Sequence, residues 1–272
     1  MLRKILSSLI VFTLFITLFS NVSSAQNNNF IEQPELNQKA QKELKKSMGK
    51  NQAKKFKTEV KYDRKKQQHK IKIENANNQI ADLNSEVLID QDNNIEMKIN
   101  YVDDFNNEVE STYEVLPVVY SETELVAEII DKKTGERHLI NTNELNASVV
   151  PVIIAQIIRV GVSAAIGTVG RALVKAAVKK VTFKNKTKFD EHYKKHVTDQ
   201  KEYGKITKNE YLEIAQNIIG SDSPNVLSKK RADGSRVFYD KKNNDFVVLS
   251  KDGYIQTLFK PKDGIAYYNR QK

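Results

Sequence analysis

Residues Arg236–Lys260 read RVFYDKKNNDFVVLSKDGYIQTLFK. Runs rich in Val, Phe, Tyr and Ile alternate there with the turn sequences 242–244 (Lys-Asn-Asn) and 252–253 (Asp-Gly). Short β-branched and aromatic runs joined by Asn and Gly turns are typical of antiparallel hairpins. The stretch therefore predicts a β-meander. We expect five strands in all, at Leu227–Arg231, Arg236–Asp240, Asp245–Ser250, Tyr254–Lys260 and Ala266–Asn269.

Two helices are predicted to precede this meander. Thr207 and Glu210 stand three residues apart, which is the spacing of a capping box at a helix start. The helix that they open ends at Gly220. A second helical pattern runs from Lys188 to about Thr198, with its aromatic residues on one face. Residues 182–272 therefore predict an α+β domain in which two helices are followed by an antiparallel meander.

Residues 148–181 form an apolar segment that contains no acidic residue. Gly, Ala and Ser recur in it at a spacing of four, which lets helices approach closely in membranes. However, no uncharged run reaches the roughly 20 residues of a standard membrane span. Two interpretations remain open. The segment is either a helical pair that contacts a membrane transiently, or a buried helix and linker between two domains.

Residues 54–147 predict an acidic antiparallel β domain of about seven strands. Side chains alternate between apolar and polar along Phe56–Tyr62 and Ile95–Tyr101, which is typical of a sheet with one solvated face. The acidic excess of the chain falls in this block. Its carboxylates either cover a basic surface of the C-terminal module or belong to an ordinary solvated face.

The N-terminus predicts export. Arg3 and Lys4 precede an apolar run, and Ser23 and Ala25 supply the small residues of a cleavage site. We expect residues 1–25 to be a signal peptide cleaved after Ala25, with an uncleaved anchor as the alternative. Residues 26–53 are polar and basic and predict a flexible arm with one helix near Glu35–Met48.

Composition limits the chemistry. The chain has 272 residues and no Cys, which excludes disulfide scaffolds, thiolate zinc sites and cysteine nucleophiles. Its net charge is +10, and the basic residues gather in the arm, the apolar segment and the C-terminal module. Such unevenness indicates separate modules, and a basic module is able to meet nucleic acid or an anionic membrane.

Four pieces of the C-terminal third form an ordered set: FDEHYKKH at 189–196, YGKITKNEYLEIAQ at 203–216, KKRADGSRVFYDKKNNDFVVLSKDGYIQTLFKP at 229–261 and YYNRQ at 267–271. In this order and spacing they resemble the toxin nucleases of the barnase–EndoU–colicin–RelE-like (BECR) superfamily. The succession of signal peptide, sheet domain and apolar pretoxin segment also resembles secreted toxins of Gram-positive bacteria.

The resemblance implies an antibacterial toxin whose C-terminal domain cleaves RNA, with tRNA the expected substrate, without metal or other cofactor. A cognate immunity protein is implied as well, and charge complementarity predicts that its surface is acidic. In this chemistry the 2′-hydroxyl attacks the adjacent phosphorus, which requires a base, an acid and fixed positive charge.

Nine residues are candidates for that site. His192, His196, Thr257 and Arg231 are the catalytic candidates, since imidazole exchanges protons near neutral pH and Arg binds phosphate in bidentate fashion. The substrate-binding candidates offer charge, hydroxyl groups or a stacking ring, and they are Lys195, Arg236, Tyr239, Lys260 and Tyr268. Each has a plainer alternative, because His192 and His196 also suit helix packing and the arginines suit a solvated turn. A zinc pair is disfavoured, because no third ligand stands near the two histidines.

Two other functions compete with the nuclease. A membrane-active toxin would use residues 148–181 as its working element. A non-enzymatic secreted binding protein would use both ordered parts for interaction alone.

Overall fold

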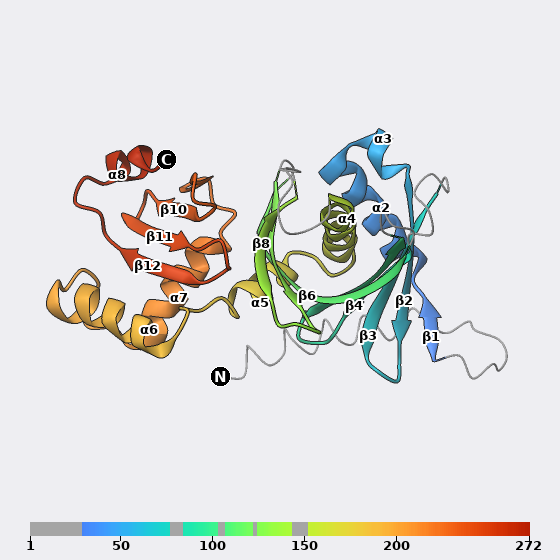
Figure 1. Ribbon diagram of the computed structural model, residues 1–272, viewed down its shortest axis with the longest axis horizontal. Coiled ribbons are helices and arrows are strands. Elements are labelled where there is room, and N and C mark those ends of the chain that lie inside the picture. Colours follow the sequence, from blue (N-terminus) through green and yellow to red (C-terminus); the bar gives the residue numbers. More distant parts are fainter. Residues whose placement is uncertain (1–28, 77–83, 103–106, 122–123, 143–151) are drawn as a thin grey trace, which may run out of the picture.

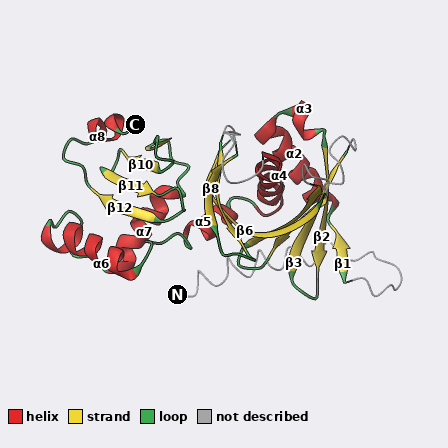
Figure 2. Ribbon diagram, viewed as in Figure 1, coloured by secondary structure: helices red, strands yellow, loops and turns green. Residues whose placement is uncertain are grey.

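The computed structural model describes residues 29–76, 84–102, 107–121, 124–142 and 152–272. Within them the chain forms two sheets, each with its own helices (Figures 1 and 2). The expected multi-domain organisation of an antiparallel sheet domain followed by an α+β domain is confirmed at this level. The predicted signal peptide and its cleavage site lie outside the described residues.

The N-terminal sheet is an antiparallel meander whose neighbours in space are neighbours in the chain. Seven of its strands fall in the span where about seven were predicted. In order, the eight strands are β1 (Phe30–Glu32), β2 (Phe56–Asp63), β3 (Gln68–Asn75), β4 (Asn84–Ile89), β5 (Ile95–Val102), β6 (Glu108–Tyr120), β7 (Leu125–Asp131) and β8 (Arg137–Asn141).

Alternation along the strands decides which face of this sheet is buried. Val60 pairs with Ile71, Ile71 with Val87 and Val87 with Met97, and none of the four is more than 1% exposed. They form a continuous apolar row across β2–β5. On the other face, some carboxylates pair with lysines of the same domain, as Glu96 does with Lys132 and Glu86 with Lys70. Part of the acidic block is thus a solvated face with its own ion pairs.

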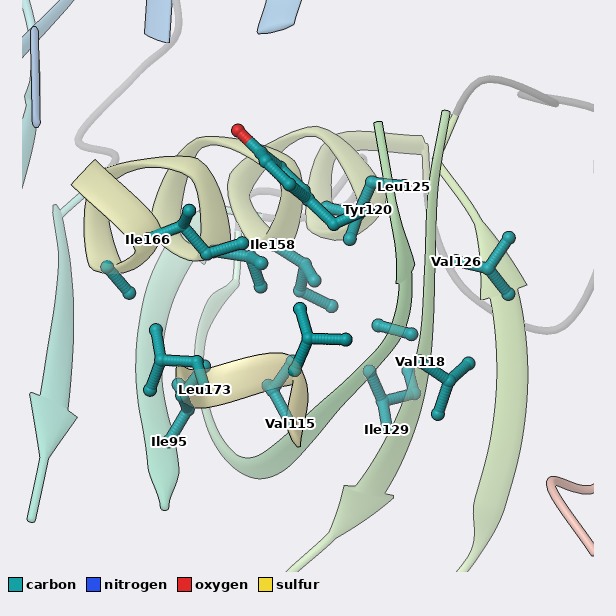
Figure 3. Close-up of a cluster of buried hydrophobic side chains, with 14 of the residues drawn as sticks. Ile95, Val115, Val118, Tyr120, Leu125, Val126, Ile129, Ile158, Ile166 and Leu173 are labelled. Atoms are coloured by element: carbon teal, nitrogen blue, oxygen red, sulfur yellow. The ribbon is translucent and has the colours of Figure 1, made fainter. Parts of the chain in front are cut away.

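Two helices cover the buried face. The sheet curves around α4 (Val152–Val169), and α2 (Pro34–Met48) lies beside it (Figure 1). Val115, Val118 and Ile129 point from β6 and β7 toward Ile158 of α4 and Leu173 of α5 (Ala172–Val178) in Figure 3. A short helix, α3 (Lys50–Ala53), follows α2. The core of the N-terminal domain therefore needs helices from both ends of its sequence.

The apolar segment is a structural element of this domain. Ile157, Ile158 and Val160 of α4 are at most 1% exposed, and Arg159 donates a hydrogen bond to the carbonyl of Ser47 at the end of α2. No single described helix is long and apolar enough to cross a membrane; α4 and α5 reach that length only together, across a bend of 116°. In this conformation the segment buries its apolar surface against the sheet.

Residues 34–53, predicted as part of a flexible arm, form helices that pack into the core. Leu44 and Ala40 are completely buried against α4, and Glu43 accepts a 2.5 Å hydrogen bond from the Tyr120 hydroxyl. The apolar face of α2 is narrow and built partly from Ala, so it lacks the broad apolar stripe that identifies most core helices in a sequence. The helix predicted near Glu35–Met48 is present as α2, whereas the prediction that this arm is flexible is corrected for residues 34–53.

The C-terminal domain has the predicted order of helices and then strands. Its sheet is antiparallel in the order β12-β11-β10-β9, with α7 on one face and α8 on the other. The elements are α6 (Lys186–Tyr193), the π-helix η1 (Lys194–Asp199), α7 (Lys208–Ile219), β9 (Val226–Lys230), β10 (Arg236–Asp240), β11 (Asp245–Leu249), β12 (Ile255–Phe259) and α8 (Ile265–Arg270). The capping box of Thr207 and Glu210 opens α7 as predicted.

The predicted fifth strand, Ala266–Asn269, is instead part of α8. Gly264, at a φ of +54°, turns the chain out of the sheet before this helix begins. Tyr268 of α8 then packs on Tyr239 of β10, with ring centroids 5.9 Å apart. The aromatic pair closes a small second core on that face of the sheet. The packing of Tyr268 in this core accompanies the helix, and it overrides the local β-propensity of the segment.

The connection between the two domains, residues 179–183, is bound at the level of its backbone. The Gln216 side chain donates hydrogen bonds of 3.0 and 2.9 Å to the carbonyls of Lys179 and Val181. The Ile255 amide donates to the Thr182 carbonyl at 2.8 Å. Val181 and Phe183 are buried. The linker is thus integrated into the folded C-terminal domain.

The domains also meet along β7 and β8. The Leu139 amide donates a 2.9 Å hydrogen bond to the Lys251 carbonyl, and the Arg137 guanidinium lies 4.7 Å from the centre of the Tyr254 ring. Gly253, at a φ of +80°, sits against the Glu128 carboxyl so closely that a Cβ there would overlap it. This glycine is required both by its backbone conformation and by the close approach.

Glu128 should make the stability of the chain depend on pH. Its side chain is fully buried; one oxygen pairs with Arg137, and the other, Oε2, has no hydrogen-bond partner. Burial raises its pKa from 4.5 to about 7, against the opposing effect of Arg137. The folded state therefore keeps the proton that the unfolded state loses above about pH 4.5. The free energy of unfolding should therefore fall by up to about 3 kcal/mol as the pH rises from 4.5 to 7. It should stay at this lower value above pH 7.

Urea unfolding at about pH 5 and about pH 8 measures this effect. Glu128→Gln should remove most of the difference between the two conditions. Glu110→Gln is the matched control, since the Glu110 side chain is exposed on β6 and the variant should behave as the wild type does. An equal pH dependence in the wild type and in Glu128→Gln would contradict the prediction.

Candidate active site

Two of the predicted catalytic residues meet where α6 passes the edge strand β12. His192 lies in the last turn of α6, and Thr257 is the central residue of β12. Thr257 Oγ1 and His192 Nδ1 are 3.3 Å apart. When Nδ1 carries the proton it donates to the Thr257 hydroxyl oxygen, which leaves Nε2 unprotonated and able to accept a proton from a substrate.

His196 joins this pair through an unusual helix. Residues 194–199 form a π-helix, whose wider turn follows α6 directly. The rings of His192 and His196 are nearly parallel at 10°, with centroids 5.9 Å apart, and His196 stacks on Phe259 at 5.5 Å. Single π-helical turns within helices are frequent at functional sites. The stack places both imidazoles along the edge of β12.

The environment of His192 favours its neutral form. Burial is the main cause that lowers its pKa below the ordinary 6.5, and the positive charges of His196 and Lys195 lower it further. The ring is half-buried, with Phe183 at a centroid distance of 5.6 Å. A histidine that is neutral at pH 7 is able to accept a proton, which is the role of a general base.

His196 is almost fully buried and faces a carboxylate that the sequence did not single out. Glu202 Oε2 lies 3.2 Å from His196 Nδ1 and accepts a 2.9 Å hydrogen bond from the Lys260 amide. Glu202 follows the π-helix in a loop, where no pattern distinguishes it from the other acidic residues. It was missed because only the fold brings it to the histidines.

Three charged candidates are placed differently from one another. Lys195 is exposed on η1, next to the histidines. The Lys260 ammonium lies 2.7 Å from Asp245 and also donates to a backbone carbonyl, so its charge is neutralised within the domain. Arg231 follows β9, the opposite edge strand, about 14 Å away by three strand spacings. There it binds Ser235 and Asp233.

The remaining candidates are structural. Arg236 is 5% exposed, and its guanidinium binds both oxygens of Glu124 in the N-terminal domain, at 2.9 and 2.6 Å. Tyr239 of β10 and Tyr268 of α8 are buried against each other, and the Tyr239 hydroxyl donates to Asn244 at 2.9 Å. The structure therefore brings together His192, His196, Thr257 and Lys195, whereas it does not bring Arg231, Arg236, Tyr239 or Tyr268 to them.

A cavity of about 530 Å³ opens on the far side of Glu202, between α7 and the end of the sheet. In its lining Lys260 is paired with Asp245, and Asp240 accepts hydrogen bonds from the Lys242 backbone amide and the Asn243 side chain. The described residues include no group of three or more His, Asp or Glu able to hold a metal ion. The histidine site is therefore the stronger candidate for chemistry.

No protein-family model matches the chain, and no curated protein matches it either.

Proposed function

We propose that this chain is a secreted antibacterial toxin whose C-terminal domain cleaves RNA by metal-independent attack of the 2′-hydroxyl. The contact between His192 and Thr257 beside an exposed lysine is the observation that carries the proposal. We include in it a BECR-like fold for residues 182–272, supported by the order of two helices and a four-stranded meander. We propose tRNA as the substrate, because the motif resemblance implies it.

In the proposed reaction His192 removes the proton from the 2′-hydroxyl. The 2′-oxygen then bonds to phosphorus, the bond from phosphorus to the 5′-oxygen breaks, and that oxygen takes up a proton. The products are a 2′,3′-cyclic phosphate and a free 5′-hydroxyl. The lowered pKa of His192 supports its role as base, and Lys195 supplies positive charge for the developing phosphorane.

The proposal extends to the biology of the chain. Export through the predicted signal peptide keeps the nuclease away from the RNA of its producer. A cognate immunity protein with an acidic surface would protect the producer against any toxin that folds inside the producing cell. Opposite charges would speed the binding of the immunity protein to the basic toxin domain. The burial of α4 in the N-terminal core favours this function over a membrane-active toxin, because its apolar surface is already covered.

The test uses purified residues 26–272 and tRNA in the presence of EDTA. In the described part of the chain the two domains meet through Lys251, Tyr254 and Arg236, away from His192 and Thr257, so the full mature chain is suitable. We expect cleavage with a 2′,3′-cyclic phosphate end, and a fall of about 100-fold or more for His192→Ala, because the base is lost. Thr257→Ala should lose less activity, and Thr257→Ser should keep most of it.

His138→Ala is the matched control, because His138 lies on β8, away from the site, and its loss should leave cleavage unchanged. RNA left intact by the wild-type protein would refute the ribonuclease function. Cleavage that EDTA abolishes would refute the metal-independent mechanism.

A further inference from the structure

Glu202 is a carboxylate at ion-pair distance from His196, and three contacts fix it there. Its backbone amide donates to the His196 carbonyl at 2.9 Å, and its side chain accepts from the Lys260 amide at 2.9 Å. Its Oε2 is 3.2 Å from His196 Nδ1. The residue thereby ties the end of the π-helix to the end of β12.

In the described residues the ion-pair partner of the Glu202 carboxylate is His196. The Lys260 ammonium is turned toward Asp245, 2.7 Å away, so that lysine contributes only its backbone amide to Glu202. The His196 side chain is 5% exposed and that of Glu202 is 18% exposed, so water screens their attraction weakly. Nδ1 of His196 is buried and has no hydrogen-bond partner, with this carboxylate at ion-pair distance.

We propose that Glu202 is a positioning residue for RNA cleavage, which keeps a proton on Nδ1 of His196 and so makes His196 the acid that serves the leaving 5′-oxygen. The assignment rests on the ribonuclease function proposed above. A carboxylate that faces one ring nitrogen fixes the tautomer and orientation of the imidazole and stabilises the imidazolium. The step balances, since His192 gains the proton of the 2′-hydroxyl while His196 gives one to the 5′-oxygen.

The neighbours of His196 fit this division of roles. His192 faces it from α6 and Phe259 from β12, so Glu202 is the acidic group among the residues in contact with its ring. A positive His196 in turn helps keep His192 unprotonated, and its charge is among the causes that lower the pKa of His192.

The experiment combines imidazole ¹⁵N NMR with kinetics on residues 26–272. The chain has four histidines, so single substitutions assign their signals. Glu202→Gln keeps the size of the side chain and the acceptor for the Lys260 amide but removes the charge. We expect a smaller imidazolium fraction of His196 at about pH 6.5 and a fall in kcat of about 10-fold with KM unchanged. Glu202→Asp should restore part of the loss, because it retains the charge.

Glu213→Gln is the matched control, since Glu213 is exposed on α7 and its replacement removes the same charge from the same domain. If Glu202→Gln leaves both the imidazolium fraction and kcat equal to those of Glu213→Gln, the role of Glu202 is refuted. If the wild-type protein leaves RNA intact, the ribonuclease function fails and the catalytic role of Glu202 fails with it. The NMR readout is independent of cleavage, so the two failures are distinguishable.

Discussion

Replacement of Glu124 by alanine is expected to destabilise the folded chain by about 3 kcal/mol, because it strands a buried guanidinium. Arg236 is 5% exposed and reaches Glu124 through both terminal nitrogens, with Ser228 as a further acceptor at 3.0 Å. The two partners are 112 residues apart and belong to different domains. Loss of the carboxylate should therefore weaken the attachment of one domain to the other.

Urea unfolding followed by tyrosine fluorescence and by circular dichroism measures this effect. We expect a lower midpoint for Glu124→Ala and a separation of the two domains into distinct transitions. The double variant Glu124→Leu, Arg236→Met should recover much of the loss, because an apolar pair leaves no buried charge. Glu136→Ala, at an exposed position, is the control. A Glu124→Ala variant as stable as this control would contradict the prediction.

Gly167→Leu should lower the stability of the N-terminal domain by about as much as Glu124→Ala lowers that of the folded chain. A Cβ at Gly167 would lie 2.7 Å from both the Ala40 Cα and the Lys39 carbonyl oxygen. These are backbone atoms of α2, so no side-chain rotation relieves the overlap. The helices would have to separate, and the apolar contacts around Leu44 would be lost with them. We expect a cost of at least about 3 kcal/mol, at the upper end of overpacking effects.

The comparison for this variant is Ala172→Leu, which adds a side chain of the same size at an exposed position of α5. Thermal unfolding of both proteins should show a large fall in the midpoint for Gly167→Leu and little change for Ala172→Leu. If the Gly167→Leu protein has the same midpoint of thermal unfolding as the wild type, α2 and α4 do not cross at this point.

The features that were predictable from the sequence are the local ones. Strand β10 has the predicted bounds, because its apolar run and the turns beside it are set within a few residues. The capping box of Thr207 was predictable for the same reason. The antiparallel sheet of the N-terminal domain followed from alternation, which depends only on which face is buried.

The features that were missed depend on partners far away in the chain. Arg236 has the chemistry of a phosphate ligand, and only the fold shows that Glu124 occupies it. Small residues at a spacing of four left both a membrane contact and a buried helix open, whereas the fold shows that Gly167 serves the crossing of α4 with α2. The site was partly predictable, since His192 and His196 share a helical pattern. Their meeting with Thr257 and Glu202 needs the path of the chain from η1 to β12.

The bound linker has a consequence for how the C-terminal domain would be released. A protease takes its substrate as an extended, accessible segment, and such segments are found in exposed loops. In residues 179–183 the carbonyls of Lys179, Val181 and Thr182 are held by Gln216 and Ile255, and the side chains of Val181 and Phe183 are buried. Cleavage within residues 181–183 therefore requires that the chain be cut before it folds, or be locally unfolded first.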